Sequence, residues 1–361
     1  MARVIFLRGG PGEQPDEPVK SRGSVLNQSA RSVTVHYFRL HSVETMKAII
    51  SKGLGPSVRL AIGERKTPVP GNGDVLVKVH AASVNPKDWK LNLNLARMTT
   101  PVGSRFLPPL FGDDLAGEVV ETGAQVNGFK VGDRIYGMDM RLQTASLAEY
   151  AVIDQRRVAP MPASASFMEA AAAPLAAQTA LQGLRKGRAT RGSSVLIIGA
   201  SGGVGTYAVQ IARLLGCHVT GVCSTRNVEL VESLGADEII DYTAGDYRQS
   251  AGPFDLVFDV TSHETPSSCS AMRKPGGHFI STMGNGRATA STLLARGQNA
   301  ALIRVESYTR DLATIAEWMD AGQLRSIIDS CYPLAQAQQA YDRSRSGRAR
   351  GKIVIDMMGS K

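Results

Sequence analysis

The sequence predicts an α/β protein with a doubly wound parallel sheet in its middle and a β-rich part before it. Three observations support this fold class. An apolar run, a glycine cluster and an amphipathic segment follow one another between residues 193 and 216. Five further short apolar runs follow at the spacing of alternating strands and helices. Residues 46 to 165 instead carry short alternating segments rich in Gly, Pro and Val, a pattern typical of strands.

Length and composition narrow the class of protein. The 361 residues, 43% of them hydrophobic, are enough for two domains, and the absence of low-complexity tracts argues against a disordered or fibrous chain. No apolar run approaches the roughly 20 residues of a membrane-spanning helix, so we expect a soluble protein with no membrane partner. Because the cysteines show no C-x-x-C pair, we expect neither disulfides nor a zinc knuckle, but a reducing, cytoplasmic location. They are Cys217, Cys223, Cys269 and Cys331.

The charge balance favours anionic partners. There are 41 Lys and Arg against 32 Asp and Glu, a formal net charge of +9. Aromatic residues make up only 6% of the chain, and none lies within the densest basic cluster, so a surface for stacking bases is missing. We therefore expect no nucleic-acid partner and interpret the cluster as a solvated face or a salt-bridged helix end. It comprises Arg343, Arg345, Arg348, Arg350 and Lys352.

The first 45 residues differ from the rest of the chain. They hold a Gly-Gly-Pro-Gly run, two further prolines and a Ser- and Arg-bearing stretch without sustained periodicity. A disordered extension, a targeting segment or a start codon assigned upstream of the real one would each explain them. The acidic residues Glu13, Asp16 and Glu17 argue against a transit peptide. A strand-like Met-Lys-Ala-Ile-Ile begins at Met46, and we expect the folded body to begin there.

The glycine cluster carries the chemical prediction. The apolar residues 195 to 198 suit a buried parallel strand, and apolar residues recur at helical spacing from residue 204 to residue 215. A pyrophosphate at such a turn meets free N–H groups and the positive end of the helix dipole, which requires small residues there. The alternative is a glycine-rich turn that only connects two elements. We predict a dinucleotide site formed by Gly199, Ser201, Gly202, Gly203, Val204 and Gly205.

The segments after this turn complete the predicted sheet. We expect a second strand at residues 218 to 223, a helix at 227 to 234, and further strands at 238 to 242, 255 to 260, 277 to 282 and 301 to 305. Together with the strand before the turn, they make about six strands, which is a complete doubly wound sheet.

The end of the second strand indicates which dinucleotide binds. A carboxylate there accepts a hydrogen bond from the ribose 2′-OH of NAD and repels a 2′-phosphate. This chain instead has Ser224, Thr225 and Arg226 and no acid, which favours NADPH. The alternative for Arg226 is an ordinary solvated surface arginine.

Seven motifs occur in one order along the chain. They are residues 84–88 (Val-Asn-Pro-Lys-Asp), 112–120, 131–137 and 148–150, Pro174 with Thr179 and Ala180, the glycine turn, and residues 351–355 (Gly-Lys-Ile-Val-Ile). In this order they resemble the medium-chain dehydrogenase/reductase superfamily and, within it, the zinc-independent quinone oxidoreductase-like branch, which includes NADPH:quinone reductases and enoyl reductases. The likeness covers residues 46 to 357.

The resemblance implies a discontinuous catalytic domain. A GroES-like, β-rich domain would span residues 46 to 165 and 308 to 361, with a Rossmann NADPH-binding domain at residues 166 to 307 inserted into it. The active site would lie in the cleft between the two, near the carboxyl ends of the parallel strands. Relatives commonly form homodimers by pairing sheet edges of the cofactor domain, so we expect a homodimer.

The resemblance also bears on zinc. Zinc-dependent members bind the catalytic metal through a Cys, a His-Glu pair and a further Cys. Here the position similar to the His-Glu pair is Asp113-Asp114, and no cysteine precedes Cys217. We therefore expect no zinc. A hard-cation or base role is possible for the two aspartates, but we interpret them as turn residues that bond their own backbone.

Without a Lewis acid, protein groups must meet the negative charge of the reaction. Acceptors that delocalise this charge are then favoured, so the expected substrate is a small electrophile. We predict an NADPH-dependent enzyme that transfers a hydride to a quinone or an α,β-unsaturated carbonyl. Two alternatives stay open: a zinc-free carbonyl or alcohol oxidoreductase, and a non-catalytic NADPH-binding sensor or structural protein.

The resemblance assigns the candidate catalytic residues. Asn85 would bond the substrate carbonyl, and Lys90 stands where relatives often carry a tyrosine proton donor. Asp88 would be a structural hydrogen-bonding partner, and Thr179 would lie beside the nicotinamide. The alternatives are a solvated lysine for Lys90 and, for Thr179, a hydrogen bond to its own helix backbone.

The remaining candidates concern the cofactor and substrate selection. Tyr242 matches a tyrosine near the adenosine phosphate in related reductases, with a half-buried strand-end tyrosine as the alternative. Met283 and Gly284 are expected at the cofactor. With Asn285 and the loop of residues 91 to 111, they would also select the substrate. The six histidines show no paired spacing, and we assign none of them a role.

Overall fold

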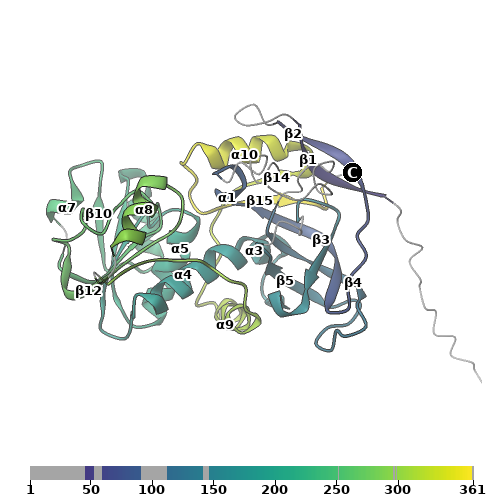
Figure 1. Ribbon diagram of the computed structural model, residues 1–361, viewed down its shortest axis with the longest axis horizontal. Coiled ribbons are helices and arrows are strands. Elements are labelled where there is room, and N and C mark those ends of the chain that lie inside the picture. The colour runs from purple at the N-terminus through teal and green to yellow at the C-terminus, as the bar shows by residue number, and fades with distance from the viewer. Residues whose placement is uncertain are drawn as a thin grey trace, which may run out of the picture. The chain divides into compact units, whose positions relative to one another are not determined.

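The computed structural model describes residues 45–52, 59–90, 112–140, 146–250, 252–295, 297 and 299–359 (Figure 1). The predictions for residues 1 to 44 and for the loop of residues 91 to 111 therefore fall outside the described residues. The strand expected at Met46 is confirmed, because β1 spans Thr45–Lys52 and pairs antiparallel with β2, Arg59–Lys66.

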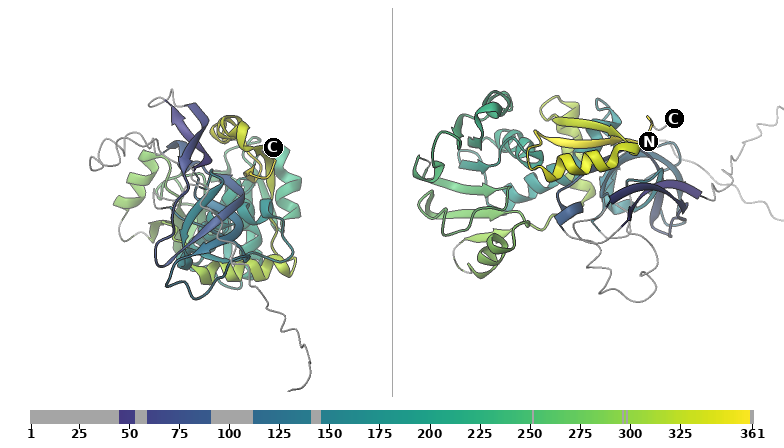
Figure 2. Two further views of the ribbon diagram at one scale, coloured as in Figure 1. Left: turned by 90° about the vertical axis from the view of Figure 1, so that its right-hand side faces the viewer. Right: turned by 90° about the horizontal axis from the view of Figure 1, so that it is seen from above.

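One sheet combines strands from both ends of the described chain. Its order is β14-β15-β3-β4-β5-β7, and β6 also pairs with β3. β15 runs antiparallel to β3 and parallel to β14, so two late strands extend an early sheet beside β3 (Figure 2). We call it the first sheet. Its strands are β3 (Asp74–Val84), β4 (Asp114–Thr122), β5 (Arg134–Met138), β6 (Tyr150–Asp154), β7 (Val158–Pro160), β14 (Ile328–Pro333) and β15 (Lys352–Asp356).

The predicted six-stranded parallel sheet is confirmed. Its order is β10-β9-β8-β11-β12-β13, and every pair is parallel. From β8, the chain adds β9 and β10 on one side of the sheet and then β11, β12 and β13 on the other. Ligands bind at the carboxyl ends of the strands where the strand order switches sides in this way. We call it the second sheet. Its strands are β8 (Ser194–Ile198), β9 (His218–Cys223), β10 (Glu238–Asp241), β11 (Phe254–Asp259), β12 (Arg273–Ser281) and β13 (Ala300–Leu302).

The helices begin and end where the local chemistry requires. Ser166 caps α3, because its hydroxyl accepts from the Glu169 N–H while the Glu169 carboxylate accepts from the Ser166 N–H. Pro174 stands at the start of α4, where a missing N–H costs nothing. The helices are α1 (Lys87–Lys90), α3 (Phe167–Ala172), α4 (Pro174–Lys186), α5 (Gly203–Leu214), α6 (Val228–Ser233), α7 (Tyr247–Ser250), α8 (Gly286–Leu294), α9 (Thr309–Asp320) and α10 (Ala337–Arg345).

Close packing fixes α4 against the second sheet. A Cβ at Gly183 would lie 2.3 Å from the Phe258 ring, so only glycine lets the helix approach β11 this closely. At the other side, the Tyr136 hydroxyl on β5 donates to the Leu312 carbonyl of α9 over 2.5 Å. The second contact connects the sequence on both sides of residue 165.

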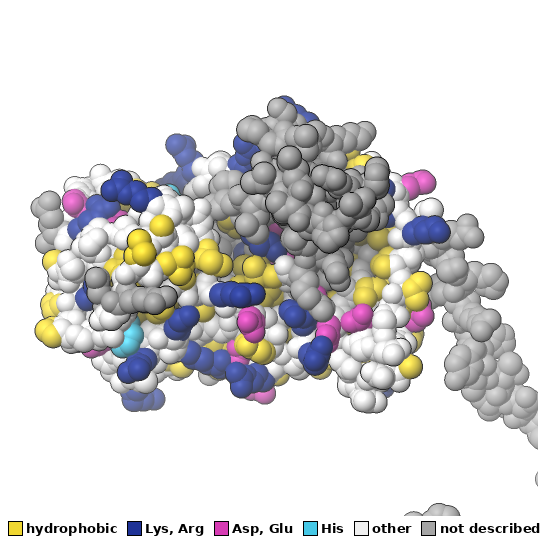
Figure 3. Space-filling view, in the orientation of Figure 1, with side chains coloured by type: hydrophobic (Ala, Val, Ile, Leu, Met, Phe, Trp, Pro, Cys, Tyr) yellow, Lys and Arg dark blue, Asp and Glu magenta, His cyan; other side chains and the backbone are white. Residues whose placement is uncertain are grey.

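The surface charges are mixed and the cysteines are unpaired. On the face shown in Figure 3, Lys and Arg side chains are spread among Asp and Glu side chains rather than gathered in one patch. All four cysteines are free thiols, and only Cys331 is exposed. Among the described residues, no helix combines the length and apolarity that crossing a bilayer requires.

Candidate active site

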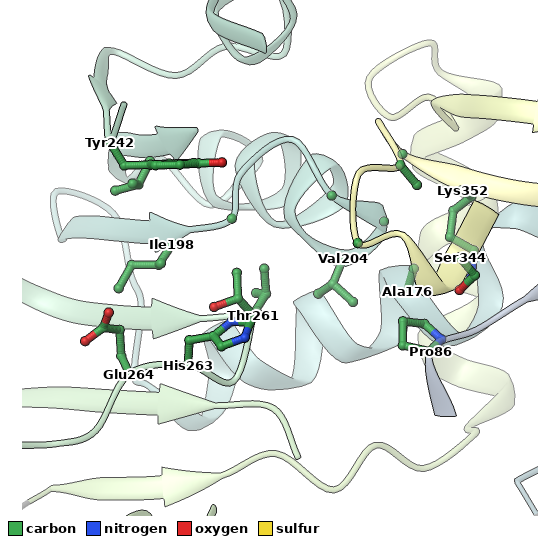
Figure 4. Close-up of a pocket in the computed structure, with 18 of the residues that line it drawn as sticks. Pro86, Ala176, Ile198, Val204, Tyr242, Thr261, His263, Glu264, Ser344 and Lys352 are labelled. Atoms are coloured by element: carbon green, nitrogen blue, oxygen red, sulfur yellow. The ribbon is translucent and has the colours of Figure 1, made fainter. Parts of the chain in front are cut away.

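A cavity of about 920 Å³ lies at the carboxyl ends of the second sheet's strands. The glycine turn between β8 and α5 contributes to its wall, and so do residues of β3 and β15 from the first sheet. Figure 4 shows Tyr242 and Ile198 towards one end, Val204 in the middle, and Pro86 and Lys352 towards the other. A ligand that follows this wall passes from the second sheet to the first.

The predicted glycine turn has the geometry of a phosphate cradle. Gly199 has a φ of +88°, and a Cβ at Gly205 would lie 2.1 Å from the Gly199 carbonyl oxygen. Both positions therefore require glycine. The N-cap of α5 is Gly202, so no capping side chain satisfies the first N–H groups of this helix. These groups and the helix dipole suit a pyrophosphate.

Most of the predicted cradle residues lie at the cavity. Gly199, Gly202, Gly203 and Val204 line it. Ser201 directly precedes the lining residue Gly202. Its hydroxyl accepts a hydrogen bond from Asn227 Nδ2 over 2.9 Å. Sequence reasoning missed this role of Asn227, although it directly follows the residues predicted to select the cofactor.

The segment after β9 is held by hydrogen bonds that the sequence pattern did not indicate. Thr225 Oγ1 donates to Asp241 Oδ2 over 2.5 Å, and Arg226 Nη2 donates to the Arg348 carbonyl over 3.2 Å. Ser224 Oγ accepts from Asn227 Nδ2 over 3.2 Å. The predicted cofactor-selecting residues therefore contact the strand beside them and the segment that precedes β15.

A carboxylate from the neighbouring strand, Asp241, lies beside the end of β9. The parallel register pairs Asp241 on β10 with Cys223, the last residue of β9. Hydrogen bonds from Thr225 and Thr243 lower the pKa of the Asp241 carboxyl, so it is charged at neutral pH. The end of β9 itself carries no carboxylate, but the neighbouring strand brings one to the Thr225 hydroxyl.

Tyr242 lines the cavity and keeps 54% of its surface exposed (Figure 4). The nearby cavity wall is stabilised by a buried carboxylate, that of Glu264. It accepts from the Tyr247 hydroxyl over 2.5 Å and from Arg248 Nη2 over 2.6 Å. This cluster joins the segment after β10 to the segment after β11. The rule that ligands bind at the ends of parallel strands would have pointed to Glu264 and its neighbour His263, which also lines the cavity.

At the other end of the cavity, Asn85 has two partners. Its Nδ2 donates to Asp114 Oδ2 over 2.9 Å, and its Oδ1 accepts from Lys352 Nζ over 2.6 Å. Asn85 and Lys352 are 1% and 4% exposed, and both line the cavity. One hydrogen bond uses the nitrogen and the other the oxygen of the side-chain amide, so the orientation of the Asn85 side chain is fixed.

The prediction that Asp113 and Asp114 bond their own backbone is wrong. Asp114 is the first residue of β4, and its side chain is fully buried. Its Oδ2 accepts from Ser83 Oγ over 2.5 Å and its Oδ1 from the Leu175 N–H over 2.7 Å. The Asp113 carboxylate accepts from Lys87 Nζ over 2.6 Å. Since β4 starts at Asp114 and pairs with β3, both aspartates face distant partners rather than a turn.

Asp88 supports the Asn85 backbone. Its Oδ2 accepts from the Asn85 N–H over 2.7 Å, and its carbonyl accepts from the Tyr341 hydroxyl. Burial, together with the nearby Asp113 carboxylate, raises the pKa of Asp88 to about 8. Burial also raises the pKa of Asp113 to about 6, although Lys87 opposes this shift. The Asp113 carboxylate therefore disfavours ionisation of Asp88.

The structure does not bring Thr179, Met283 or Gly284 to the described cavity wall. Thr179 Oγ1 donates to the Leu175 carbonyl over 2.6 Å, one turn back in its own helix. Met283 is 53% exposed, and neither it nor Gly284 is among the described lining residues. Asn285 caps α8. Lys90 ends α1, and its side chain falls outside the described residues.

The residues near Asp114 do not fit a zinc ion. The carboxylate of Asp114 already has the Lys352 ammonium 3.3 Å away, and Asp113 is paired with Lys87. Across the part of the chain that the structure describes, no three His, Cys, Asp or Glu side chains are grouped as metal ligands. The Asp114 oxygens are bound by the Ser83 hydroxyl, by the Asn85 and Leu175 N–H groups and by Lys352, and Lys87 binds Asp113 Oδ1. Among the described residues, no sulfur or imidazole ligand accompanies them. The glycine cradle, by contrast, fits a dinucleotide.

Two family models match the chain. Residues 71–163 match the family model of the alcohol dehydrogenase GroES-like domain, and residues 234–355 match that of the zinc-binding dehydrogenase. The chloroplast envelope quinone oxidoreductase homolog of Arabidopsis thaliana is 34% identical over 304 residues, covering 80% of this chain and 91% of that protein.

Two further proteins cover most of the chain. The 2-methylene-furan-3-one reductase of Solanum lycopersicum is 34% identical over 291 residues, covering 78% of this chain and 71% of that protein. Among solved structures, the quinone oxidoreductase from Coxiella burnetii has a TM-score of 0.78 and 28% identity, covering 87% of this chain and 99% of that one.

Proposed function

The chain belongs to the medium-chain dehydrogenase/reductase superfamily, among quinone oxidoreductases, and from this premise we propose an NADPH-dependent, zinc-free reductase of quinones or α,β-unsaturated carbonyls. The observation that carries the proposal is the wall of one cavity. It joins a glycine cradle to an amide and an ammonium, those of Asn85 and Lys352. The two relatives, a quinone oxidoreductase homolog and a 2-methylene-furan-3-one reductase, support this substrate class.

The cradle would hold the cofactor across the cavity. The first N–H groups of α5 would bind the pyrophosphate, and Tyr242 would lie near the adenosine. Arg226 is exposed beside the segment after β9 and supports the choice of NADPH, because a guanidinium binds a 2′-phosphate in a bidentate manner. A charged carboxylate, Asp241, lies on the neighbouring strand and accepts from Thr225. It opposes a 2′-phosphate there, so the choice of NADPH depends on Arg226.

The chain's own residues prepare the acceptor. Bound NADPH supplies the hydride. Asn85 Nδ2 carries one N–H for Asp114 and a second that can bond a carbonyl oxygen in the cavity. Val84, Leu175 and Ala176 form an apolar wall beside it, which excludes water from the reacting carbon. A delocalising acceptor needs only this orientation and one favourable charge, and no metal.

Stopped-flow spectroscopy tests the proposal. We expect the nicotinamide absorbance of NADPH to fall on mixing with members of a quinone and enone panel. If no quinone or enone of the panel makes the absorbance fall, although NADPH is bound, the proposal is contradicted and a cofactor-binding sensor is favoured. Turnover of simple saturated aldehydes alone would favour the carbonyl oxidoreductase instead.

Three further properties stay proposals. We propose that residues 46 to 165 and 308 to 361 form one domain, which the shared first sheet supports.

We propose a homodimer, since β13 leaves an edge of the second sheet unpaired within the described chain. We propose a cytoplasmic location because all four thiols are free. Light scattering and fractionation test the last two.

A further inference from the structure

Lys352 is a buried cation at the reacting end of the cavity. Its side chain is 5% exposed, and its Nζ lies 2.6 Å from Asn85 Oδ1 and 3.3 Å from Asp114 Oδ2. Burying an ammonium is costly unless it is paired and hydrogen-bonded, and here both conditions are met. The sequence analysis placed this lysine in a basic cluster interpreted as a solvated face or a salt-bridged helix end. For Lys352 both interpretations are wrong, because it is the first residue of β15, in the interior of the first sheet.

The backbone holds Lys352 against the phosphate cradle. The Gly351 N–H donates to the Ser201 carbonyl over 3.0 Å, and Gly351 forms a β-bridge with Gly202. A Cβ at Gly203 would lie 3.0 Å from Lys352 Cδ, so the lysine stem lies along the first turn of α5. The ammonium therefore lies beyond the cradle, beside the Asn85 amide.

An ammonium has three N–H donors. Asn85 Oδ1 and Asp114 Oδ2 accept two of them, and the side chain forms part of the cavity wall. The third donor can therefore bond an oxygen atom of a ligand. Asp114 itself is fixed by Ser83 and by the N-terminus of α4, so the cation is held in place before any ligand arrives.

We propose that Lys352 takes over the electrostatic role that a catalytic metal has in zinc-dependent relatives. Its ammonium donates a hydrogen bond to the oxygen of the acceptor that becomes negative, while Asp114 is a positioning residue for that ammonium. The inference rests on the proposed function. Hydride adds to the electron-poor carbon, the displaced electron pair moves onto the acceptor oxygen beside Lys352, and a proton from water completes the reduced product.

Lys352→Met tests the inference, because it removes the charge and keeps most of the volume. Loss of one fixed donor to an oxyanion lowers kcat by roughly 100-fold or more. We expect this loss with a quinone acceptor, with little change in the dissociation constant of NADPH measured by fluorescence titration. Lys352→Arg keeps the charge and should recover part of kcat.

Two further variants separate catalysis from folding. Arg185→Met removes the nearer of the two cations paired with another buried carboxylate, Asp311, away from the described cavity wall. Arg185 Nη1 lies 2.5 Å from Asp311 Oδ1, and Arg310 Nε lies 3.8 Å from it. It should lower thermal stability and keep kcat. If Lys352→Met does not fold, the double variant Asp114→Asn with Lys352→Met removes both charges and should fold without recovering kcat.

Three results would overturn the inference. Wild-type kcat in folded Lys352→Met, or in the folded double variant, excludes a role for the cation. A loss confined to NADPH affinity would assign Lys352 to the phosphate cradle instead. A wild-type protein that reduces no quinone or enone would remove the proposed function and the inference together, whereas the first two results leave the proposed function standing.

Discussion

Asp114 Oδ1 lies 2.7 Å from the backbone nitrogen of Leu175 and accepts its N–H. A carboxylate at the start of β4 thus satisfies an N–H in the first turn of α4, where negative charge also complements the helix dipole. The same carboxylate binds Ser83, Asn85 and Lys352 through its other oxygen. One fully buried side chain therefore connects the first sheet, the helix and the candidate active site.

Asp114→Ala should strongly destabilise the protein. It leaves Lys352 as a buried cation without its carboxylate, which costs about 3–5 kcal/mol of unfolding free energy. Urea denaturation measures the loss. Lys274→Ala, which breaks a half-exposed pair with Asp255, is the control and should cost at most about 1 kcal/mol. Equal losses in the two variants would show that the buried network contributes no more than a surface ion pair.

Gly202→Ala should separate cofactor binding from folding. A Cβ at Gly202 would meet nothing closer than the Gly199 carbonyl oxygen at 3.4 Å, so the fold tolerates it. The added methyl stands at the N-cap of α5, where a pyrophosphate must approach the backbone, and we expect NADPH affinity to fall by roughly tenfold or more. Gly205→Ala, with its 2.1 Å approach, should instead lower the melting temperature. Unchanged NADPH affinity in folded Gly202→Ala would argue against this turn as the phosphate site.

Arg226→Ala should reduce the preference for NADPH over NADH. A charge-assisted hydrogen bond is worth about 1.5–3 kcal/mol, so the preference should fall by roughly 10-fold to 100-fold. Calorimetric titration with both cofactors measures it. Arg310→Ala, on α9 and largely exposed, serves as the control and should not change the preference. Equal affinity of the wild type for both cofactors would contradict the assignment.

Asp88→Asn should flatten the pH dependence of stability. Burial and the nearby Asp113 raise the pKa of Asp88 from 3.8 to about 8, so the folded protein binds more protons than the unfolded chain between about pH 4 and pH 8. The contribution of Asp88 to stability is therefore greatest in acid and is lost as pH rises through this window. The asparagine oxygen can still accept from the Asn85 N–H, and it does not titrate.

Urea midpoints between pH 5 and pH 9 measure this effect. We expect the wild type to lose stability across the range and Asp88→Asn to lose less. The same slope in both proteins would mean that Asp88 keeps an ordinary pKa in the folded state. Asp246→Asn, at a half-exposed position, is a suitable control.

Local sequence predicted the second sheet well. β9 spans the predicted residues 218 to 223, and β8 and α5 begin within one residue of their predicted starts. A buried parallel strand, a glycine turn and an amphipathic helix each carry their signal within a few residues, so no distant partner is needed to recognise them.

The reacting end of the site could not be predicted in the same way. Asn85 and Lys352 are 267 positions apart, and Asp114 and Lys352 are 238 apart. Their pairing depends on β15 lying beside β3, which neither composition nor periodicity indicates. Asp241 was missed at the end of β9 for the same reason, since it reaches Thr225 only through the register of two strands.

The place of β15 also has a consequence for how the protein is made. β3 pairs with β15, and Lys352 on β15 completes the Asp114 network. During synthesis, β3 and β4 leave the ribosome long before β15 exists, so a strand position in the first sheet stays open while the second sheet can already fold. The edge of β3 that faces β15 therefore lacks its partner strand until residue 356 has emerged.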